Sequence, residues 1–453
     1  MLAVILGLFT AINAFITYRF YKMAGARFDF TRIDPLTYIY SVQLVMASFG
    51  SYLIAANLVE NDWVNYLSSS DPVRLIGWVL VQYGFLGCSI GLYLGVKSFN
   101  QRHKSSTFLT SLTRKSIPKS SHFITWVLLF GLCTMSALHV FHSLGGIPQL
   151  SILSSSGNAL AVLRSNTKLN FSGVTFIRDF GFVACVQVLA YYAYSLKLQH
   201  PKTLRFRTLY WLSLPMAVLA LTLNLEKGPI VIFFFSLLTI RFFHGRRTSI
   251  VALGFILILL MGLLVGTYIV ALGTDRTALS LAQEIIGRIL IAQVAGVFMT
   301  LSIFPAEYEF VLFSGIGVLT DAFGGVQSDG SARIVMQHFR PKEVELGLLG
   351  YMSSYFIAEA YGNFGALGVL FSPFIVGAVT AFIFTILRRF HNANLAIATI
   401  TYVAFNLPYT SNFVAFYYSP GIWILLLILI VLGNMRLITR YTDKSTLLSD
   451  TKA

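Results

Sequence analysis

The stretch Arg333–Lys342, RIVMQHFRPK, sets three basic residues and a histidine among apolar side chains. It is the centre of a larger segment, Gly273–Gly365, in which both signs of charge gather. Connecting segments of this length are usually functional or disordered, and the apolar and aromatic content here argues against disorder. We therefore interpret 273–365 as the functional face of the protein and the other residues as its scaffold.

The composition of the chain is that of a membrane protein. Of its 453 residues, 56% are hydrophobic and 11% are charged, whereas a soluble domain carries about 25% charged residues. The apolar segments are continuous rather than alternating, which excludes a closed β-barrel. The sequence predicts an all-α polytopic membrane protein in which residues 1–453 form a single integral membrane domain.

Long apolar runs mark the individual spans, because a helix needs about 20 apolar residues to cross a bilayer. We expect about eleven transmembrane helices, at residues 1–18, 35–56, 74–96, 122–142, 172–196, 208–224, 228–243, 248–272, 366–387, 392–407 and 418–436. Two more apolar segments, Ile289–Phe304 and Phe310–Leu319, lie inside the functional face. We favour re-entrant or interfacial positions in the outer leaflet for both; a crossing pair is the alternative.

The basic residues assign the joints between spans to two sides of the membrane. One side collects 23 of the 33 Lys and Arg but 4 of the 18 Asp and Glu; its segments are 19–34, 97–121, 197–207, 241–247, 388–391 and the tail from Arg436. By the positive-inside rule this side is cytoplasmic. We expect a cytoplasmic C-terminus, with the N-terminus and 273–365 in the periplasm. The net charge of +15 then follows from topology and does not indicate a nucleic-acid partner.

Basic residues on the outer side are candidates for substrate binding, since the same rule disfavours them there. A planar guanidinium stays charged and binds phosphate oxygens bidentately, so a cluster of them suits a diphosphate. The alternative is anchoring to lipid headgroups or local pairing, for example of Arg178 with Asp179. The candidates are Arg164, Arg178, Lys227, Arg276, Arg288, Arg333 and Arg340.

Two residues are candidates for a catalytic base. His338 is the one histidine of the functional face, and a neutral imidazole near pH 7 can accept a hydroxyl proton. An ordinary solvated loop histidine is the alternative. Glu359 precedes a long apolar run, and an ionisable residue at a membrane boundary indicates function by default. Tyr361 can stack on a sugar ring or belong to an aromatic belt.

Several familiar motifs are absent from the sequence. It contains no phosphate-cradling glycine loop, no HExxH and no Asp-x-Asp pair. Cys88, Cys133 and Cys185 lie in apolar segments without metal-ligand spacing, as buried small hydrophobic residues do. We therefore expect neither a metal nor a cofactor.

The chain combines many spans with a basic outer loop from Gly146 to Arg164, Arg178 opening the next span, the turn Asn224–Pro229, Arg288 before a semi-apolar segment, and Glu359–Gly365 before a late span. Together these features resemble the Wzy-type O-antigen polymerases, which join oligosaccharide repeat units, over most of the chain. The family's glycine at a fixed distance after its outer-loop arginine is not matched after Arg164, and an arginine is commoner in the family at the position of Lys227.

The resemblance implies a GT-C-like fold and an inverting, metal-independent glycosyltransferase of a bacterial inner membrane. Such an enzyme transfers a growing glycan from undecaprenyl diphosphate to a newly flipped lipid-linked repeat unit, which makes 273–365 its periplasmic catalytic stretch. Its partners would be the undecaprenyl-diphosphate-linked oligosaccharide, membrane lipid and a Wzz-type chain-length regulator.

Two other functions fit the sequence. An O-antigen ligase shares this architecture and donor but transfers the glycan to lipid A core. A lipid-linked oligosaccharide flippase would instead place charges near the bilayer midplane and show two related halves. The ionisable residues gather at the outer ends of the predicted spans, which favours the polymerase.

Overall fold

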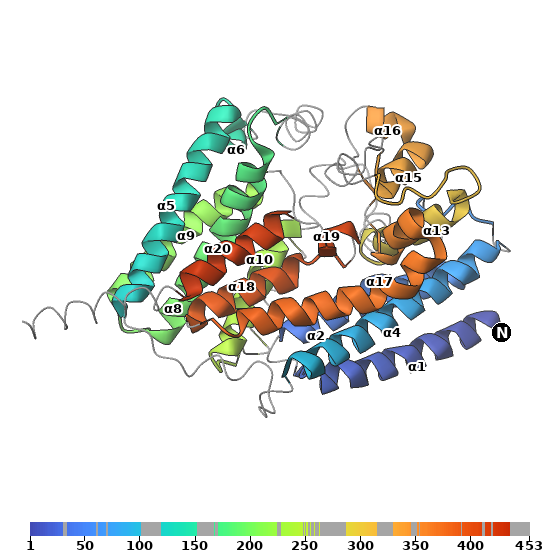
Figure 1. Ribbon diagram of the computed structural model, residues 1–453, viewed down its shortest axis with the longest axis horizontal. Coiled ribbons are helices and arrows are strands. Elements are labelled where there is room, and N and C mark those ends of the chain that lie inside the picture. The colour runs from blue at the N-terminus through green and yellow to red at the C-terminus, as the bar shows by residue number, and fades with distance from the viewer. Residues whose placement is uncertain are drawn as a thin grey trace, which may run out of the picture.

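In the computed structural model, the described part of the chain is helical and contains no β-strand (Figure 1). The structure describes residues 1–29, 34–59, 62–68, 71–100, 119–151, 167, 171–223, 228–247, 249, 251, 254, 258, 262, 287–314, 329–345, 351–352, 354–390, 392–409, 413–417 and 420–434. The all-helical prediction is therefore confirmed over these residues.

The helices follow one another in a simple order, and those labelled η are π-helical. Up to residue 199 they are α1 (Leu2–Met23), α2 (Pro35–Val42), η1 (Gln43–Phe49), α3 (Gly50–Ala55), α4 (Pro72–Asn100), α5 (Lys119–Ser143), α6 (Pro148–Ser151), η4 (Ile177–Ala184) and α8 (Cys185–Gln199). Then come α9 (Leu204–Thr222), α10 (Gly228–Phe243), η5 (Gly287–Ile291), α13 (Ala292–Ile303), α15 (Ser331–Phe339), α16 (Pro341–Glu345), α17 (Ile357–Leu387), α18 (Ala393–Asn406), α19 (Val414–Tyr417) and α20 (Pro420–Asn434).

Six of the described helices are long and apolar enough to cross a membrane, as a multi-pass membrane protein requires. They are Leu2–Met23, Pro35–Ala55, Pro72–Phe99, Ser120–Ser143, Ile177–Gln199 and Ile357–Leu387. Three shorter apolar helices accompany them, at Gly228–Phe243, Gly287–Ile303 and Ala393–Asn406. The count of eleven spans and the GT-C-like fold stay predictions.

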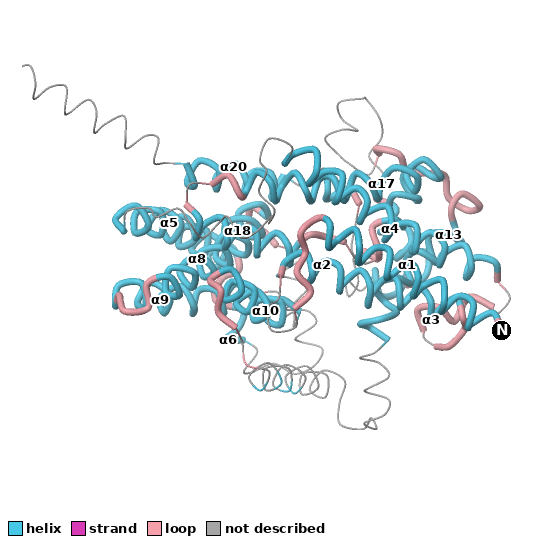
Figure 2. The backbone as a smooth tube through the Cα atoms, turned by 90° about the horizontal axis from the view of Figure 1, so that it is seen from below, coloured by secondary structure: helices cyan, strands magenta, loops and turns pink. Residues whose placement is uncertain are grey.

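The helices form two groups. In Figure 2, α1, α4 and α17 lie side by side in one group, and α5, α8 and α9 lie in the other. In the first group α4 and α17 run parallel, since Gly87 faces Pro373 and Gly95 faces Ala381. A Cβ at Gly91 would collide with the backbone of α17. Small residues at such positions let membrane helices approach closely, so this glycine row joins the two helices along their length.

Buried hydrogen bonds join α5, α8 and α18 at one end of the bundle. The Tyr192 hydroxyl lies 3.0 Å from Nδ1 of His122 and accepts a hydrogen bond of 3.0 Å from the side-chain amide of Asn392. The Asn394 amide donates to Gln199 nearby. We call this end, with the α8–α9 turn and the C-terminal ends of α1 and α4, the basic end.

Asp34 starts α2 at the basic end. Its carboxylate accepts hydrogen bonds from the backbone N–H groups of Arg27 at 2.8 Å and Leu36 at 3.4 Å, which caps the helix N-terminus. Burial of the side chain raises the pKa of Asp34 to about 7. The connection between α1 and α2 is thus held by a buried carboxyl group.

Candidate functional site

The opposite end of the bundle is built around a reversal of the chain inside α17. Gly365 has φ +60° and ψ −141°, so the helix Ile357–Phe364 turns back sharply onto the helix that follows. Gly368 consequently touches the backbone of Ala360. The reversal needs a glycine, because positive φ and close backbone contact both disfavour a side chain. We call Ile357–Phe364 the hook.

The hook begins deep in the bundle rather than at its surface. Tyr355, just before it, lies against Gly84 near the middle of α4 and donates a hydrogen bond of 2.7 Å to Gln43. Such re-entrant backbone is tolerated at membrane depth where protein surrounds it. Sequence analysis placed the start of this span at residue 366, whereas the structure has the helix hooked ahead of that position.

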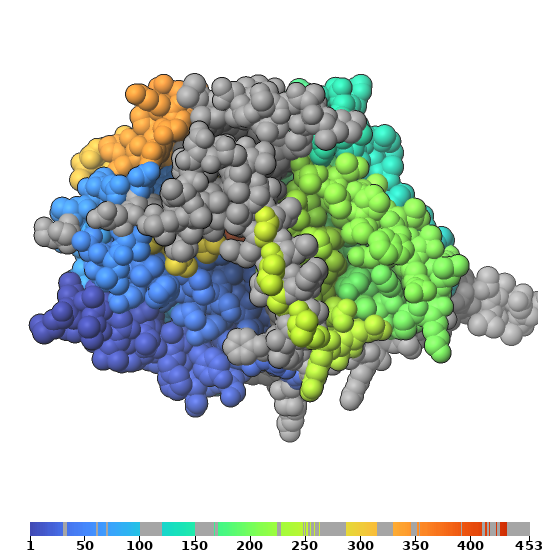
Figure 3. Space-filling view, turned by 180° about the vertical axis from the view of Figure 1, so that it is seen from behind, coloured from blue at the N-terminus to red at the C-terminus, as the bar shows by residue number. Residues whose placement is uncertain are grey.

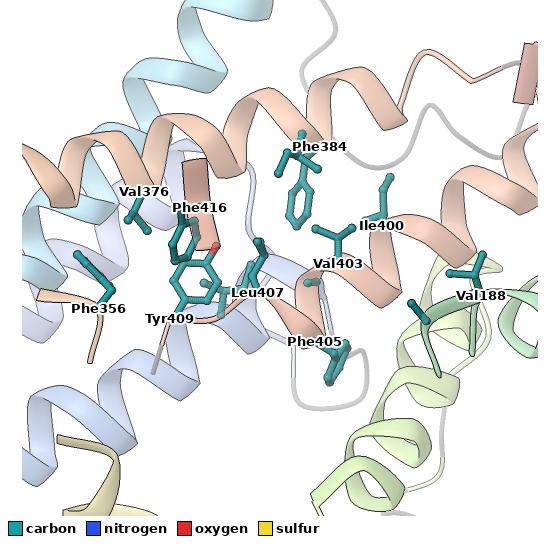
Figure 4. Packing of buried hydrophobic residues seen from close by; sticks show 14 of the residues in the cluster. Val188, Phe356, Val376, Phe384, Ile400, Val403, Phe405, Leu407, Tyr409 and Phe416 are labelled. Atoms are coloured by element: carbon teal, nitrogen blue, oxygen red, sulfur yellow. The ribbon is translucent and has the colours of Figure 1, made fainter. Parts of the chain in front are cut away.

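Glu359, which lies on the hook, anchors a second place where the helical path is broken, between α18 and α20. The side chain is 8% exposed, and its Oε2 accepts hydrogen bonds from the backbone N–H groups of Phe413 and Val414, where α19 begins. Figure 4 shows Phe356, Tyr409 and Phe416 packed together beside α17. The carboxylate therefore holds the backbone between α18 and α20 in place.

The short helix α15 lies on the hook. Ser331, its first residue, occupies the space above Gly362, and the N–H groups of Val311 and Leu312 donate to the hook carbonyls at 3.1 and 2.8 Å. The Ser331 hydroxyl is buried and has no hydrogen-bond partner among the described residues. We call α15, α16, the hook and Phe304–Ser314 the α15 end.

His338 lies on α15 beside two residues of the preceding turn. Its Nδ1 is 3.6 Å from Oε2 of Glu307 and 3.5 Å from the Tyr308 hydroxyl. The rings of Tyr308 and His338 meet edge to face with centroids 5.8 Å apart. A carboxylate beside one ring nitrogen selects the tautomer and leaves the other nitrogen as the base. The arrangement can therefore accept a proton from a hydroxyl group.

The two arginines of this region each pair with a carboxylate. Arg333 lies 3.3 Å from Asp329, and its guanidinium stands 5.8 Å from the ring centroid of Tyr351. Arg340 lies 3.5 Å from Glu343 and 5.1 Å from the ring centroid of Trp63. Both arginine side chains are about a third exposed, at 32% and 30%. The α15 end thus presents cations flanked by aromatic rings.

Arg178 is placed on the first turn of η4, away from α15. It is 6% exposed, pairs with Asp179 at 2.7 and 3.0 Å, and donates a 2.8 Å hydrogen bond to the Thr167 carbonyl. The local pairing of Arg178 with Asp179 that was considered from the sequence is present.

Tyr361 of the hook donates a 3.3 Å hydrogen bond to the Phe304 carbonyl. Arg288 is exposed on η5, the short helix directly before α13.

Five candidates lie on the elements of the α15 end: Arg333 and His338 on α15, Arg340 directly after it, and Glu359 and Tyr361 on the hook. Arg164, Lys227 and Arg276 lie outside the described residues. Of the apolar segments in the functional face, Ile289–Phe304 covers η5 and α13, which pack inside the bundle with Val294–Thr300 buried. The second, Phe310–Leu319, is described only through residue 314.

Sequence reasoning missed the partners of these candidates, chiefly Glu307, Tyr308 and Trp63. The cluster Glu307-Tyr308-Glu309, set between two apolar segments, was the available signal. Within the described residues, no group of three His, Cys, Asp or Glu could hold a metal ion. No family model, curated protein or solved structure matches this chain.

Proposed function

We propose that this protein is a membrane glycosyltransferase that polymerises undecaprenyl-diphosphate-linked oligosaccharides at its α15 end. The observation that carries the proposal is His338 beside Glu307 and Tyr308 on a helix laid over the hook. The distribution of Lys and Arg supports a position of this end on the outer side of the membrane, where the proposed lipid-linked substrate is presented. The resemblance of the sequence to Wzy-type polymerases supports the same reaction.

The reaction requires little acid catalysis, because the diphosphate is already a good leaving group. The acceptor hydroxyl oxygen bonds to the anomeric carbon of the donor, and the bond from that carbon to the diphosphate oxygen breaks. The diphosphate keeps the bonding electron pair, and the hydroxyl proton passes to Nε2 of His338. Glu307 beside Nδ1 stabilises the imidazolium that results.

In this proposal, the arginines of the α15 end stabilise the negative charge on the departing diphosphate. Arg333 and Arg340 are partly exposed and carry guanidinium groups that fit phosphate oxygens. A bound diphosphate competes there with Asp329 and Glu343. Glu359 is less suited to be the base, because both hydrogen bonds of its Oε2 already anchor α19. His338 is thus the base in this proposal, and Glu359 positions the hook.

The test is an assay with purified full-length protein and a synthetic undecaprenyl-diphosphate repeat unit, without nucleotide sugar. We expect wild type to produce a ladder of longer lipid-linked glycans and His338→Gln to lose about 10²- to 10⁴-fold in rate. His142→Gln is the matched control, since His142 is exposed at the end of α5. Transfer of the glycan to lipid A core instead would identify a ligase. If the wild-type protein forms no product at all, the proposal that it is an enzyme is refuted.

A flippase for lipid-linked oligosaccharides is the second candidate, favoured by one observation. The hook and the break before α19 interrupt helices inside the bundle, and a buried carboxylate lies between them. Transporters build midplane sites from such discontinuous helices. Movement of labelled lipid-linked unit across liposomes containing the protein, without any glycan ladder, would select this function.

A further inference from the structure

The α8–α9 turn at the basic end has a surplus of positive charge. Lys197, Lys202, Arg205 and Arg207 lie within a few residues of one another, and the sequence has no acidic residue from Ser195 to Leu214. In the described part of the chain, no carboxylate pairs with any of these four cations. The described carboxylates therefore leave this positive charge without a counter-ion.

Lys197 is held by aromatic rings instead of an acid. Its Nζ lies 4.3 Å from the ring centroid of Tyr210, 5.1 Å from that of Trp211 and 5.9 Å from that of Tyr194. Arg205 is similarly placed, 3.5 Å over the ring of Phe123. Each cation–π contact contributes about 0.5–1 kcal/mol at exposed sites. The rings fix the positions of the charges without cancelling them.

An exposed apolar face of α9 continues from these cations. Leu204 is 74% exposed, Trp211 59%, Leu212 52% and Val218 50%. Their spacing puts them on one side of the helix, because residues seven or eight apart lie two turns along the same face. This surface, part of the green region in Figure 3, therefore combines a cationic end with an apolar stripe.

We propose that the α8–α9 turn binds the phosphate headgroup of an anionic phospholipid, with its acyl chains along the exposed face of α9. The four cations attract the oppositely charged phosphate, and the apolar stripe is suited to contact with the acyl chains. Trp211 marks the boundary between the two, as tryptophan does at membrane interfaces. A cationic site between helices at this boundary has the chemistry of a phospholipid headgroup site.

The test uses tryptophan fluorescence of the full-length protein in nanodiscs. Discs of phosphatidylcholine contain either brominated phosphatidylglycerol or brominated phosphatidylcholine, and the Trp211→Phe variant isolates the quenching of Trp211. We expect phosphatidylglycerol to quench Trp211 preferentially. The double variant Lys197→Gln/Arg207→Gln should lose about 30-fold in this preference, because each cation near the surface contributes about 1 kcal/mol.

The control is Lys22→Gln/Lys97→Gln, which removes two other cations of the basic end. Each of them faces a single ring, Tyr18 at 5.9 Å and Tyr93 at 6.0 Å. These lysines belong to the other helix group, and salt screens exposed charges beyond about 10 Å. We expect this control to keep the preference within about twofold, and equal losses in both double variants would refute the site.

Two further results decide the proposal. The charge-preserving variant Lys197→Arg/Arg207→Lys should retain the preference, which separates binding from any loss of folding. Added inorganic phosphate should leave the quenching unchanged, since a free anion lacks acyl chains. Displacement of the lipid by phosphate, or equal quenching by the two brominated lipids in wild type, would overturn the assignment.

Discussion

The two ends of the bundle handle positive charge in different ways. At the α15 end and on η4, each of three arginines meets a carboxylate as well as an aromatic ring: Arg178 pairs with Asp179, Arg333 with Asp329, and Arg340 with Glu343. At the basic end, cations meet aromatic rings: Lys197 faces Tyr210 and Trp211, Arg205 faces Phe123, Lys22 faces Tyr18, and Lys97 faces Tyr93.

The contrast teaches what each end is suited for. A carboxylate orients a cation and cancels its charge, which keeps a polar site specific for a ligand that can displace the acid. An aromatic face orients a cation and leaves the charge for an outside anion. The α15 end therefore suits a selective substrate site, and the basic end suits contact with an anionic membrane surface.

The largest effect is expected at Glu359, where two substitutions separate anchoring from catalysis. Glu359→Ala leaves the N–H groups of Phe413 and Val414 unpaired in a buried place and should lower the free energy of unfolding by about 3 kcal/mol. Glu359→Gln keeps an acceptor oxygen and should retain most of the stability, measured by thermal unfolding in detergent. If the Gln variant folds normally and yet loses all polymerising activity, Glu359 is the base and the assignment to His338 is wrong.

The next prediction compares equal charge removal at buried and exposed sites. Arg178→Gln removes a buried guanidinium with three described hydrogen bonds and should cost about 2 kcal/mol of unfolding free energy. Lys197→Gln should cost less than about 1 kcal/mol, because exposed cation–π contacts are weak. Thermal unfolding of both variants in the same detergent measures the difference. Equal destabilisation of the two variants would contradict the expected difference between the ion-paired Arg178 and the ring-bound Lys197.

A third prediction concerns pH and His244 at the basic end. Burial lowers the pKa of His244 to about 4, helped by Arg246, and the Ser195 hydroxyl lies 2.8 Å from its Nε2. The unfolded chain, with a histidine pKa near 6.5, then binds more protons between pH 6.5 and 4. Stability from this group is present above pH 6.5 and is lost as pH falls through that window, by about 1–3 kcal/mol.

The measurement is the difference in unfolding free energy between wild type and His244→Gln at pH 7.5 and pH 4.5. Subtraction is needed because Asp34, whose pKa is raised, contributes in the opposite sense and favours the fold more as pH falls below 7. A difference that does not change with pH would show that His244 is solvated in both states.

The smallest effect is expected for Arg340. Its ion pair with Glu343 is partly exposed, and such pairs contribute about 0–1 kcal/mol. Arg340→Gln should therefore change stability by less than about 1 kcal/mol, and a double-mutant cycle with Trp63→Ala isolates the cation–π part. A coupling energy well above that value would mean that the contact pins α15 to the turn before α4 rather than leaving Arg340 available to an anion.

Much of the organisation was readable in the sequence. Hydropathy determined the helical class, because backbone groups in a bilayer must bond within a helix. The contrast between 273–365 and its apolar surroundings marked the functional face and named His338, Arg333 and Arg340 as candidates, whereas the helices α15 and α16 were not predicted. The distribution of Lys and Arg separated the segments of the basic end from the rest.

Only the tertiary structure decided which partner each side chain meets. Glu359 and Val414 are joined by a hydrogen bond although they are 55 residues apart in the chain, and His338 and Glu307 are brought within 3.6 Å. No periodicity records such contacts, because they depend on where Gly365 reverses α17 and how α15 then packs. Local composition sets which residues enter a helix or the membrane, whereas pairing between distant segments depends on the packing of the whole bundle.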